Sequence, residues 1–452
     1  MTSELLLTPP ILATSRGAKY TLSSTAITQR RAFRRTDDFT PGTPKLKLLQ
    51  EALPQLGPTQ VLIKVHAVAL NYRDANIANG GNPWPVIPNG ILCNDAAGEV
   101  IAVGEKVAAL AVGNRVGPIT DTENISGRET KRSWLAADED GVMADHLVFD
   151  EAVLCNLPDY LDWEEASVIP CAGVTAWSAL KGMSIGQTVL IQDRTGTGGV
   201  SVFALKLASA AGLRMILTSS SDAKLQQMRE MYPSILTVNY SKIPDWDIEV
   251  MKLTGGVGVD IVVENGGASS LVKSLKCTRR SGVVSQVGYL SGQDPSYLRE
   301  LIPTIIDRRI NLRGINAGSR RDMEDLCAAL TAARTPLKDL IDRTFAFQEA
   351  EEAVEYIWQG KQIGKIVLCL SVHLSVIVIM NSMHHSNKQP SKFPARAIVT
   401  ETSGRDVELV IAVFACWPRF QCGRRVGKQL FNVFLCRPRI VQVTTTRDKF
   451  QL

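Results

Sequence analysis

The sequence of 452 residues lacks the usual marks of a secreted or membrane-spanning protein. Nine cysteines are scattered along it without a Cys-x-x-Cys pair, which indicates neither a disulfide framework nor a structural zinc knuckle. No apolar region is followed by a small-residue cleavage site for secretion. The apolar run at 366–380 is too short to cross a bilayer and contains His373. We therefore expect a cytoplasmic protein with reduced thiols and no membrane partner.

The sequence also lacks a large net charge outside its C-terminal part. The formal net charge is +5, but residues 371–452 contain 12 Lys and Arg against 4 Asp and Glu, which leaves −3 for the first 370 residues. The main body therefore does not favour a nucleic-acid partner. Residues 371–452 form a basic tail of uncertain structure, for which a membrane or nucleic-acid contact is the alternative interpretation.

The first residues are rich in Ser and Thr and show no structural period. Up to residue 35 they contain six basic residues and one acid, which resembles a mitochondrial transit peptide. The pair Pro9-Pro10 and the absence of a clean amphipathic helix favour a disordered leader over residues 1–28 instead. The six basic residues are Arg16, Lys19, Arg30, Arg31, Arg34 and Arg35.

A glycine-rich turn is the most informative feature that is present. The apolar run 189–191 predicts a buried strand, and residues 200–211 have apolar side chains at helical spacing. Between them, Gly196 permits a tight turn, and Gly198 lets the backbone approach a pyrophosphate at the helix N-terminus. Ser201 stands where the third glycine of such motifs usually lies.

A regular alternation of strands and helices follows this turn. It predicts six strands with helices between them, and hence a doubly wound parallel sheet. Strands are expected at 189–192, 214–218, 235–238, 259–263, 282–287 and 309–314. Helices are expected near 199–211, 222–231, 245–253, 268–276 and 298–306. A further helix is expected at 345–359, and a closing strand at 364–368.

The part before the alternation is rich in β-structure. Short strands are predicted at 61–70, 98–104, 114–118 and 146–149, separated by long loops. Residues 160–180 are predicted to be helical.

Several ordered motifs resemble the medium-chain dehydrogenase/reductase superfamily, in particular its zinc-independent alcohol dehydrogenase-like and quinone oxidoreductase-like branch. They include "VLIKVHAVALNYRDANI", "DAAGEVIAVGEKV", "LPDYLDWEEASVIPCAGVTAWSAL", "GTGGVSVFALKLASAAG" and "GKIVL". The resemblance implies an α/β fold with a Rossmann NADP-binding domain at 159–344. It also implies a GroES-like, β-rich catalytic domain at 29–158 that is completed by 345–370, and a possible homodimer. The residues Asp193-Arg194-Thr195 are an apparent insertion before the glycine turn.

The ligands of the catalytic zinc in zinc-dependent relatives are largely replaced. Asn71 stands at the first ligand position, Asn94-Asp95 replaces a His-Glu pair, and only Cys171 remains. No cysteine lies between 120 and 140, where the structural zinc lobe of these relatives lies. One thiolate does not hold zinc tightly, so the sequence predicts no metal.

The end of the second predicted strand favours NADPH. Ser219 and Ser220, followed by Lys224, suit a 2′-phosphate through hydrogen bonds and charge. Asp222 is the competing interpretation, as a ribose ligand of NAD, although we expect it to cap the next helix. The resemblance implies further cofactor contacts, at Thr175, Gly199, Val200, Tyr240, Gly266, Gly267, Val287 and Gly288.

Without zinc, other groups must stabilise the charge that develops on the substrate oxygen. Asn71 and Tyr72 are the candidate catalytic residues, because they occupy the former metal-ligand segment. Tyr72 either donates a proton or packs against the cofactor while water protonates the product. The expected function is hydride transfer between NADPH and a small carbonyl, enone, quinone or alcohol. The alternative is a non-catalytic NADPH-binding or sensing module, which the insertion at 193–195 favours.

Overall fold

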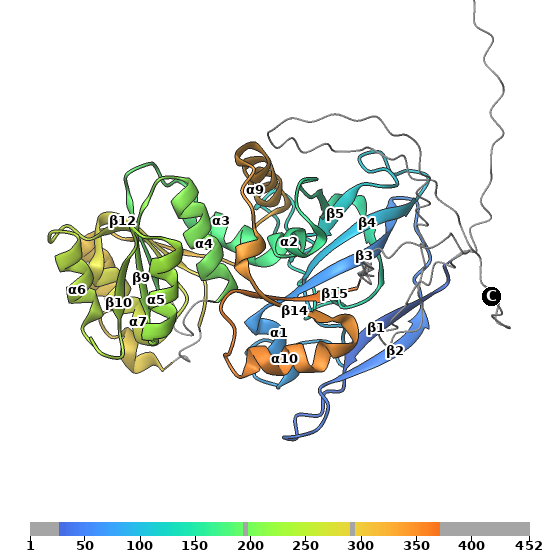
Figure 1. Ribbon diagram of the computed structural model, residues 1–452, viewed down its shortest axis with the longest axis horizontal. Helices are drawn as coiled ribbons and strands as arrows, with labels where there is room; N and C mark the ends of the chain where they lie inside the picture. Colours follow the sequence, from blue (N-terminus) through green and yellow to red (C-terminus); the bar gives the residue numbers. More distant parts are fainter. Residues whose placement is uncertain (1–26, 193–197, 290–293, 371–452) are drawn as a thin grey trace, which may run out of the picture. The chain divides into compact units, whose positions relative to one another are not determined.

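The computed structural model describes residues 27–192, 198–289 and 294–370, which form two lobes (Figure 1). The leader up to residue 26, the insertion at 193–195, Gly196 and the tail from 371 lie outside the described residues. Statements about them therefore remain predictions.

A mixed sheet forms the first lobe. Its strands lie in the order β14-β15-β3-β4-β5-β7, with β6 paired to β3. Along β3, Val61, Ile63 and Val65 alternate with more exposed residues, so one face of the strand turns to the core. The strands are β3 (Gln60–Leu70), β4 (Asp95–Val103), β5 (Arg115–Pro118), β6 (His146–Asp150), β7 (Leu154–Asn156), β14 (Ile341–Ala346) and β15 (Lys365–Cys369).

Two late segments complete this first lobe. The strand β15 pairs antiparallel with β3 and parallel with β14, so residues 341–369 return to the lobe that begins the chain. The helices α1 (Tyr72–Ala78) and α10 (Ala350–Trp358) lie side by side on it (Figure 1). The helix predicted at 345–359 begins only at Ala350, because β14 continues to Ala346 and a 3₁₀ turn (Phe347–Glu349) follows it.

The second lobe is a parallel sheet in the order β10-β9-β8-β11-β12-β13. All six predicted strands are present, although β12 begins four residues earlier than expected. They are β8 (Thr188–Gln192), β9 (Arg214–Ser219), β10 (Leu236–Asn239), β11 (Val259–Glu264), β12 (Thr278–Gln286) and β13 (Asn311–Gly314). The predicted doubly wound Rossmann sheet and the β-rich lobe beside it are thus confirmed.

Helices cover both faces of the parallel sheet (Figure 1). Val189 and Ile191 of β8 belong to one core, and Leu190 between them belongs to the other, as the period of two in a strand requires. The helices between the strands are α4 (Gly199–Ala210), α5 (Asp222–Met231), α6 (Trp246–Leu253), α7 (Ala268–Cys277) and α8 (Leu301–Arg308). The sequence analysis missed α9 (Arg320–Ala333), which follows the last parallel strand.

The predicted helix at 160–180 is broken into three pieces. These are α2 (Trp163–Ser167), a π-helical turn (Ile169–Gly173) and α3 (Val174–Leu180). Pro170 lacks the N–H that an α-helix needs at this point. The N–H of Cys171, in the first turn of the π-helical piece, donates instead to the carboxylate of Asp95.

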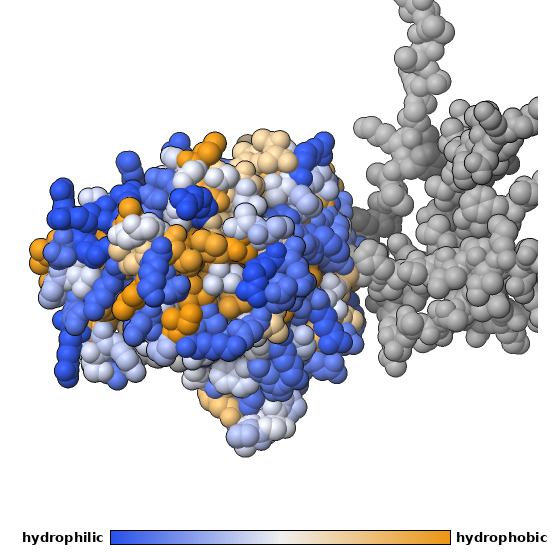
Figure 2. Space-filling model, turned by 60° about the vertical axis from the view of Figure 1, so that its left-hand side comes forward, coloured by the Kyte–Doolittle hydropathy of each residue, from blue (hydrophilic) through white to orange (hydrophobic). Residues whose placement is uncertain are grey.

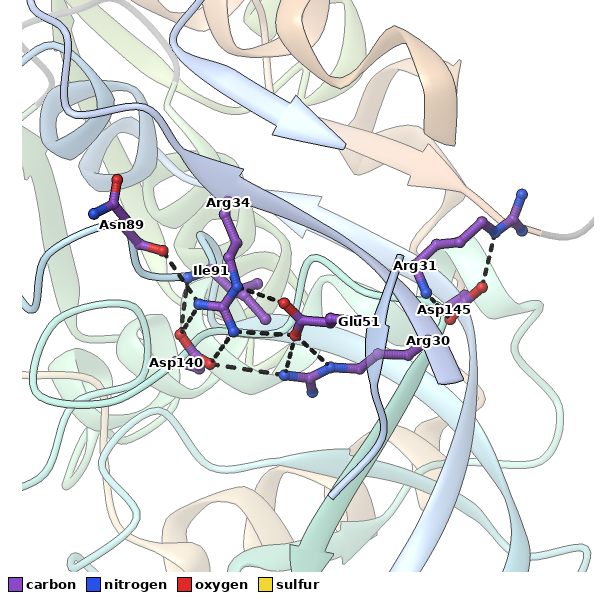
Figure 3. Close-up of polar contacts among 8 residues, drawn as sticks. All are labelled: Arg30, Arg31, Arg34, Glu51, Asn89, Ile91, Asp140 and Asp145. Carbon is purple, nitrogen blue, oxygen red and sulfur yellow. Dashed lines mark hydrogen bonds and ion pairs between the residues drawn. The ribbon is translucent and has the colours of Figure 1, made fainter. Parts of the chain in front are cut away.

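The basic residues at the start of the described chain belong to a strand. The strand β1 (Gln29–Arg35) pairs antiparallel with β2 (Leu46–Ala52). Arg34 contacts Glu51 and Asp140, and it donates to the carbonyl of Asn89; Arg30 joins the same carboxylates (Figure 3). We call Arg30, Arg34, Glu51 and Asp140 the rim network. Their charges hold β1 against neighbouring strands and loops, so they are not leader-like.

Apolar side chains also reach the surface. Figure 2 shows one face, on which apolar residues gather near the middle of the coloured part with hydrophilic residues around them. Such exposure is common in folded proteins and does not by itself indicate a partner. No helix in the described ranges is long and apolar enough to cross a membrane.

Candidate active site

The glycine turn that is predicted to bind phosphate ends at the first residue of α4. Gly198 is the N-cap of this helix and Gly199 is its first residue, followed by Val200. A Cβ atom on Gly199 would lie 2.4 Å from Cδ of Lys365, so this position has no room for a side chain. Gly198 also forms an isolated bridge with Gly364, the residue before β15. The turn therefore packs directly against the last strand of the first lobe.

Three buried polar atoms near the carboxyl ends of the parallel strands have no hydrogen-bond partner among the described residues. They are Oε1 of Gln192 on β8, Oγ1 of Thr218 on β9 and Oε1 of Gln286 on β12. Buried polar atoms are normally paired, and ligands of open α/β sheets bind at this edge. The polar lining and the glycine turn fit a dinucleotide.

The end of β9 carries the residues predicted to select NADPH. Ser219 is buried and Ser220 is exposed. Nζ of Lys224, in the first turn of α5, lies 3.2 Å from the carbonyl oxygen of Gln362, in the loop before β15. The N–H of Tyr240 donates to the carbonyl of Ser219. The predicted serines, lysine and tyrosine thus lie around one strand end.

The expectation that Asp222 caps α5 is wrong. Ser221 is the N-cap, because its hydroxyl accepts from the N–H of Lys224, and Asp222 is the first helical residue. The Asp222 carboxylate instead contacts Lys242 and accepts from Nδ2 of Asn239. Hydrogen bonds from Lys242 and Asn239 lower its pKa. This acid is therefore already engaged by other side chains.

The predicted glycines at the ends of β11 and β12 surround a buried carboxylate. Glu264 accepts from the N–H groups of Gly266 and Gly267, at 2.7 and 3.1 Å. Its carbonyl oxygen accepts from the N–H groups of Val287 and Gly288, at 2.8 and 3.2 Å. Burial raises the pKa of Glu264, while its hydrogen bonds oppose that shift. The sequence analysis named the glycines and missed the glutamate that orders them.

Thr175, the remaining predicted cofactor residue, is buried in the first turn of α3. It follows the π-helical turn that contains Cys171.

A buried ion pair lies among the residues that the sequence resemblance aligns with the ligands of a catalytic zinc. Nζ of Lys365 lies 2.8 Å from Oδ2 of Asp95 and 2.7 Å from Oδ1 of Asn71. Nδ2 of Asn71 donates to Asp95 at 2.9 Å and to Asn94 at 3.1 Å. The side chains of Lys365 and Asp95 are 1% and 0% exposed. We call Asn71, Asn94, Asp95 and Lys365 the buried network.

The groups around the buried network do not make a metal site. Burial and the nearby Asp95 raise the pKa of Cys171 to about 12, and Cys171 is the one thiol among the residues aligned with zinc ligands. The ammonium of Lys365 occupies Asp95, which would otherwise be the nearest anionic ligand. Across the described ranges there is no group of three or more His, Cys, Asp or Glu side chains suited to a metal ion. The donor set therefore does not fit zinc.

Tyr72 is the first residue of α1 and stands at the edge of the buried network. Its side chain is 38% exposed and stacks on Trp358 of α10, with ring centroids 6.3 Å apart. The Tyr72 hydroxyl makes no hydrogen bond to the described residues, whereas both N–H groups and the oxygen of the Asn71 amide are engaged.

Lys365 is the site residue that the sequence analysis did not single out. It lies within the motif "GKIVL", and its charge at the start of an otherwise apolar strand was the available signal. A lysine is almost never fully buried without a partner.

Comparison with known proteins identifies both lobes. Residues 57–159 match the alcohol dehydrogenase GroES-like domain family, and residues 199–332 match the zinc-binding dehydrogenase family. A zinc-type alcohol dehydrogenase-like protein of Schizosaccharomyces pombe is 36% identical over 338 residues, covering 72% of this chain and 96% of the relative. The chain belongs to the medium-chain dehydrogenase/reductase superfamily. It is an oxidoreductase of that superfamily.

Solved structures agree with this assignment. A crystal structure from Sinorhizobium meliloti, described as a candidate alcohol dehydrogenase, has a TM-score of 0.66 and 31% identity. It matches 76% of this chain and 99% of its own. A structure named NAD-dependent alcohol dehydrogenase has a TM-score of 0.63 and 26% identity, with coverage of 76% and 100%. These likenesses extend over both lobes of this oxidoreductase.

Proposed function

We propose that this oxidoreductase transfers a hydride between NADPH and a small carbonyl, enone, quinone or alcohol without a metal ion. The observation that carries the proposal is the ion pair of Lys365 and Asp95. The side chain of Lys365 lies beside Gly199 of the glycine turn, and Asp95 is one of the residues that the resemblance aligns with zinc ligands, which supports the proposal. A cation held there by its own carboxylate leaves no anionic site for zinc.

The second lobe supplies the residues that would hold the dinucleotide. Gly198 and Gly199 admit its pyrophosphate to the N-terminus of α4. Ser219, Ser220 and Lys224 are the proposed contacts to a 2′-phosphate. When bound, the nicotinamide supplies the hydride, which the protein itself cannot provide.

The first lobe supplies the groups that act on the substrate. Asn71 has both amide N–H groups and its oxygen engaged, which supports a role in positioning α1 rather than in donating to the substrate. Tyr72 follows it at the first turn of α1 with an unengaged hydroxyl. We propose that this hydroxyl donates a hydrogen bond or a proton to the substrate oxygen as negative charge develops there.

The test combines metal content with turnover. Purified protein is analysed for zinc, and NADPH oxidation is measured with a panel of enones and quinones, with and without a chelator. We expect turnover that the chelator does not reduce, and less than stoichiometric zinc. Stoichiometric zinc with chelator-sensitive turnover contradicts the metal-free proposal. NADPH binding without oxidation by any compound of the panel favours the non-catalytic binding module.

A further inference from the structure

Three aromatic rings form a continuous contact between the lobes. The ring of Trp84 meets that of Trp134 at 5.5 Å and that of Tyr289 at 5.2 Å, both in edge-to-face arrangement. Trp84 and Trp134 come from loops of the first lobe, and Tyr289 comes from the second. We call these three residues the aromatic cluster. Trp84 is 38% exposed, so part of its ring is open to a ligand.

The aromatic cluster lies at the edge of the sheet where the cofactor is proposed to bind. Tyr289 follows Val287 and Gly288, which come directly after the carboxyl end of β12. The guanidinium of Arg73, the second residue of α1, lies 5.9 Å from the centre of the Trp134 ring, so the start of α1 also reaches the cluster. The cluster therefore borders both the cofactor edge of the second lobe and the proposed catalytic residue.

Arg73 brings an incompletely bonded positive charge to this cluster. Its guanidinium lies 5.9 Å from the centre of the Trp134 ring, and Nη1 donates to the carbonyl of Leu135 at 3.0 Å. Its Nη2 atom is buried and has no hydrogen-bond partner among the described residues. A buried charged donor without an acceptor is costly, so this atom favours a ligand that supplies an acceptor.

A second buried arginine, Arg35, is by contrast already paired within the first lobe. Its side chain is 1% exposed, Nη1 lies 3.5 Å from a carboxylate oxygen of Asp37, and Nη2 donates to the carbonyl of Ile87. The proposed ligand contact is therefore assigned to Arg73 alone.

We propose that the substrate is a planar aromatic compound that carries a carboxylate. Its ring would pack on Trp84, Trp134 and Tyr289, and its carboxylate would accept a hydrogen bond from Nη2 of Arg73. The ring depends on aromatic pairing and the carboxylate on a charge-assisted hydrogen bond, so the two contacts can be tested separately. The term substrate rests on the proposed oxidoreductase function, but the binding site itself does not.

Binding is tested without turnover on the full chain saturated with NADP⁺. Three probes are titrated by calorimetry: cinnamate, its methyl ester, and acetate. Cinnamate should bind at least about tenfold more tightly than the ester, because only the carboxylate forms a charge-assisted hydrogen bond. Acetate should bind more weakly than cinnamate, because it lacks the ring.

Two Arg→Met variants test which arginine binds the carboxylate. Arg73→Met should abolish the preference for cinnamate over its ester. Arg132→Met is the control, because Arg132 also lies over Trp134, at 4.0 Å, but is 44% exposed and contacts Asp138. It should leave the preference within about twofold of the wild type, as surface substitutions usually do. Trp84→Ala should weaken both aromatic probes about 3- to 10-fold.

Each result decides the proposal. Because the preference compares two probes on one preparation, partial unfolding of a variant lowers both and cannot imitate a loss of selectivity. Equal binding of cinnamate and its ester by the wild type, or an unchanged preference in Arg73→Met, overturns the carboxylate contact. Acetate binding as tight as cinnamate overturns the aromatic contact. Selective cinnamate binding without NADPH oxidation by any enone leaves the binding site intact and refutes the proposed reaction instead.

Discussion

The second lobe contributes mainly backbone to the site, whereas the first lobe contributes side chains that bond to one another. After β8, the glycine turn at the start of α4 is proposed to receive the cofactor, whereas the N–H groups of Gly266 and Gly267 after β11 already donate to Glu264. In the first lobe, the side chains of Asn71, Asp95 and Lys365 form hydrogen bonds with one another. Substitutions in the first lobe should therefore change stability and turnover, and those in the second should change cofactor affinity.

The largest effect should come from breaking the buried network. Removing one partner of a buried ion pair leaves an uncompensated charge, so Lys365→Met should lower the free energy of unfolding by about 3–5 kcal/mol. Adding Asp95→Leu should restore much of the loss, because the orphaned carboxylate is then gone as well. Urea denaturation of both variants is the measurement. If the double variant is no more stable than the single, the uncompensated charge is not the cause.

Tyr72→Phe should separate chemistry from binding in the first lobe. The hydroxyl is proposed to act on charge that exists only in the transition state, so turnover should fall by about 100-fold while the Kd for NADPH stays unchanged. Steady-state kinetics and a cofactor titration provide both values. An unchanged turnover number would assign protonation to water and leave Tyr72 with a packing role on Trp358.

Lys224→Ala should show the opposite behaviour in the second lobe. A single charge-assisted contact to the 2′-phosphate would make NADPH bind about 10- to 150-fold more tightly than NADH. The variant should lose most of this preference and bind NADH almost as before. Kd values for both cofactors, with both proteins, test it. A wild type that binds NADH as tightly as NADPH would make Asp222 the better ribose ligand.

The smallest effect should come from the rim network, which is the partly exposed counterpart of the buried one. Arg34→Met should cost about 1 kcal/mol or less at neutral pH, because solvent screens exposed ion pairs. A hydrogen bond from Arg34 is the main cause of the lowered pKa of Glu51. The contribution is therefore present above the ordinary pKa of a glutamate and disappears as the pH falls through the lowered value.

Thermal melts of the Arg34→Met variant and the wild type should accordingly converge in acid. A difference in melting temperature that grows as the pH falls would show that Arg34 acts through packing of its stem instead.

The parallel sheet was predictable because its information is local. Each strand such as Val189–Ile191 is a short apolar run, and each is followed by a helix with its own period. The start of β12 was missed because Arg279, Arg280 and Ser281 are polar, although they extend the strand. The pair β1 and β2 was not predicted, because the charged residues of β1 such as Arg34 hide its alternation. Its partners Glu51 and Asp140 lie 17 and 106 residues away.

The candidate site could be singled out from the sequence at its glycines and at Asn71 and Tyr72. A Cβ atom would lie 2.4 Å from Lys365 at Gly199 and 2.2 Å from Ser270 at Gly266, so these two positions favour glycine. Lys365 contacts Asn71 across a sequence separation of 294 residues and Asp95 across 270. No local pattern encodes such a contact, so the sequence indicated the missing zinc ligands but not the cation that stands in their place.

The position of β15 has a consequence for the order in which the protein forms. This strand lies between β14 and β3 in the first-lobe sheet. The strand β3 therefore cannot complete its pairing until β15, about 300 residues later in the sequence, has been synthesised. Contacts of such high sequence separation slow folding. The second lobe, whose strands are encoded within residues 188–314, is complete on the ribosome much earlier. During synthesis, the cofactor platform should therefore mature before the half that performs the chemistry.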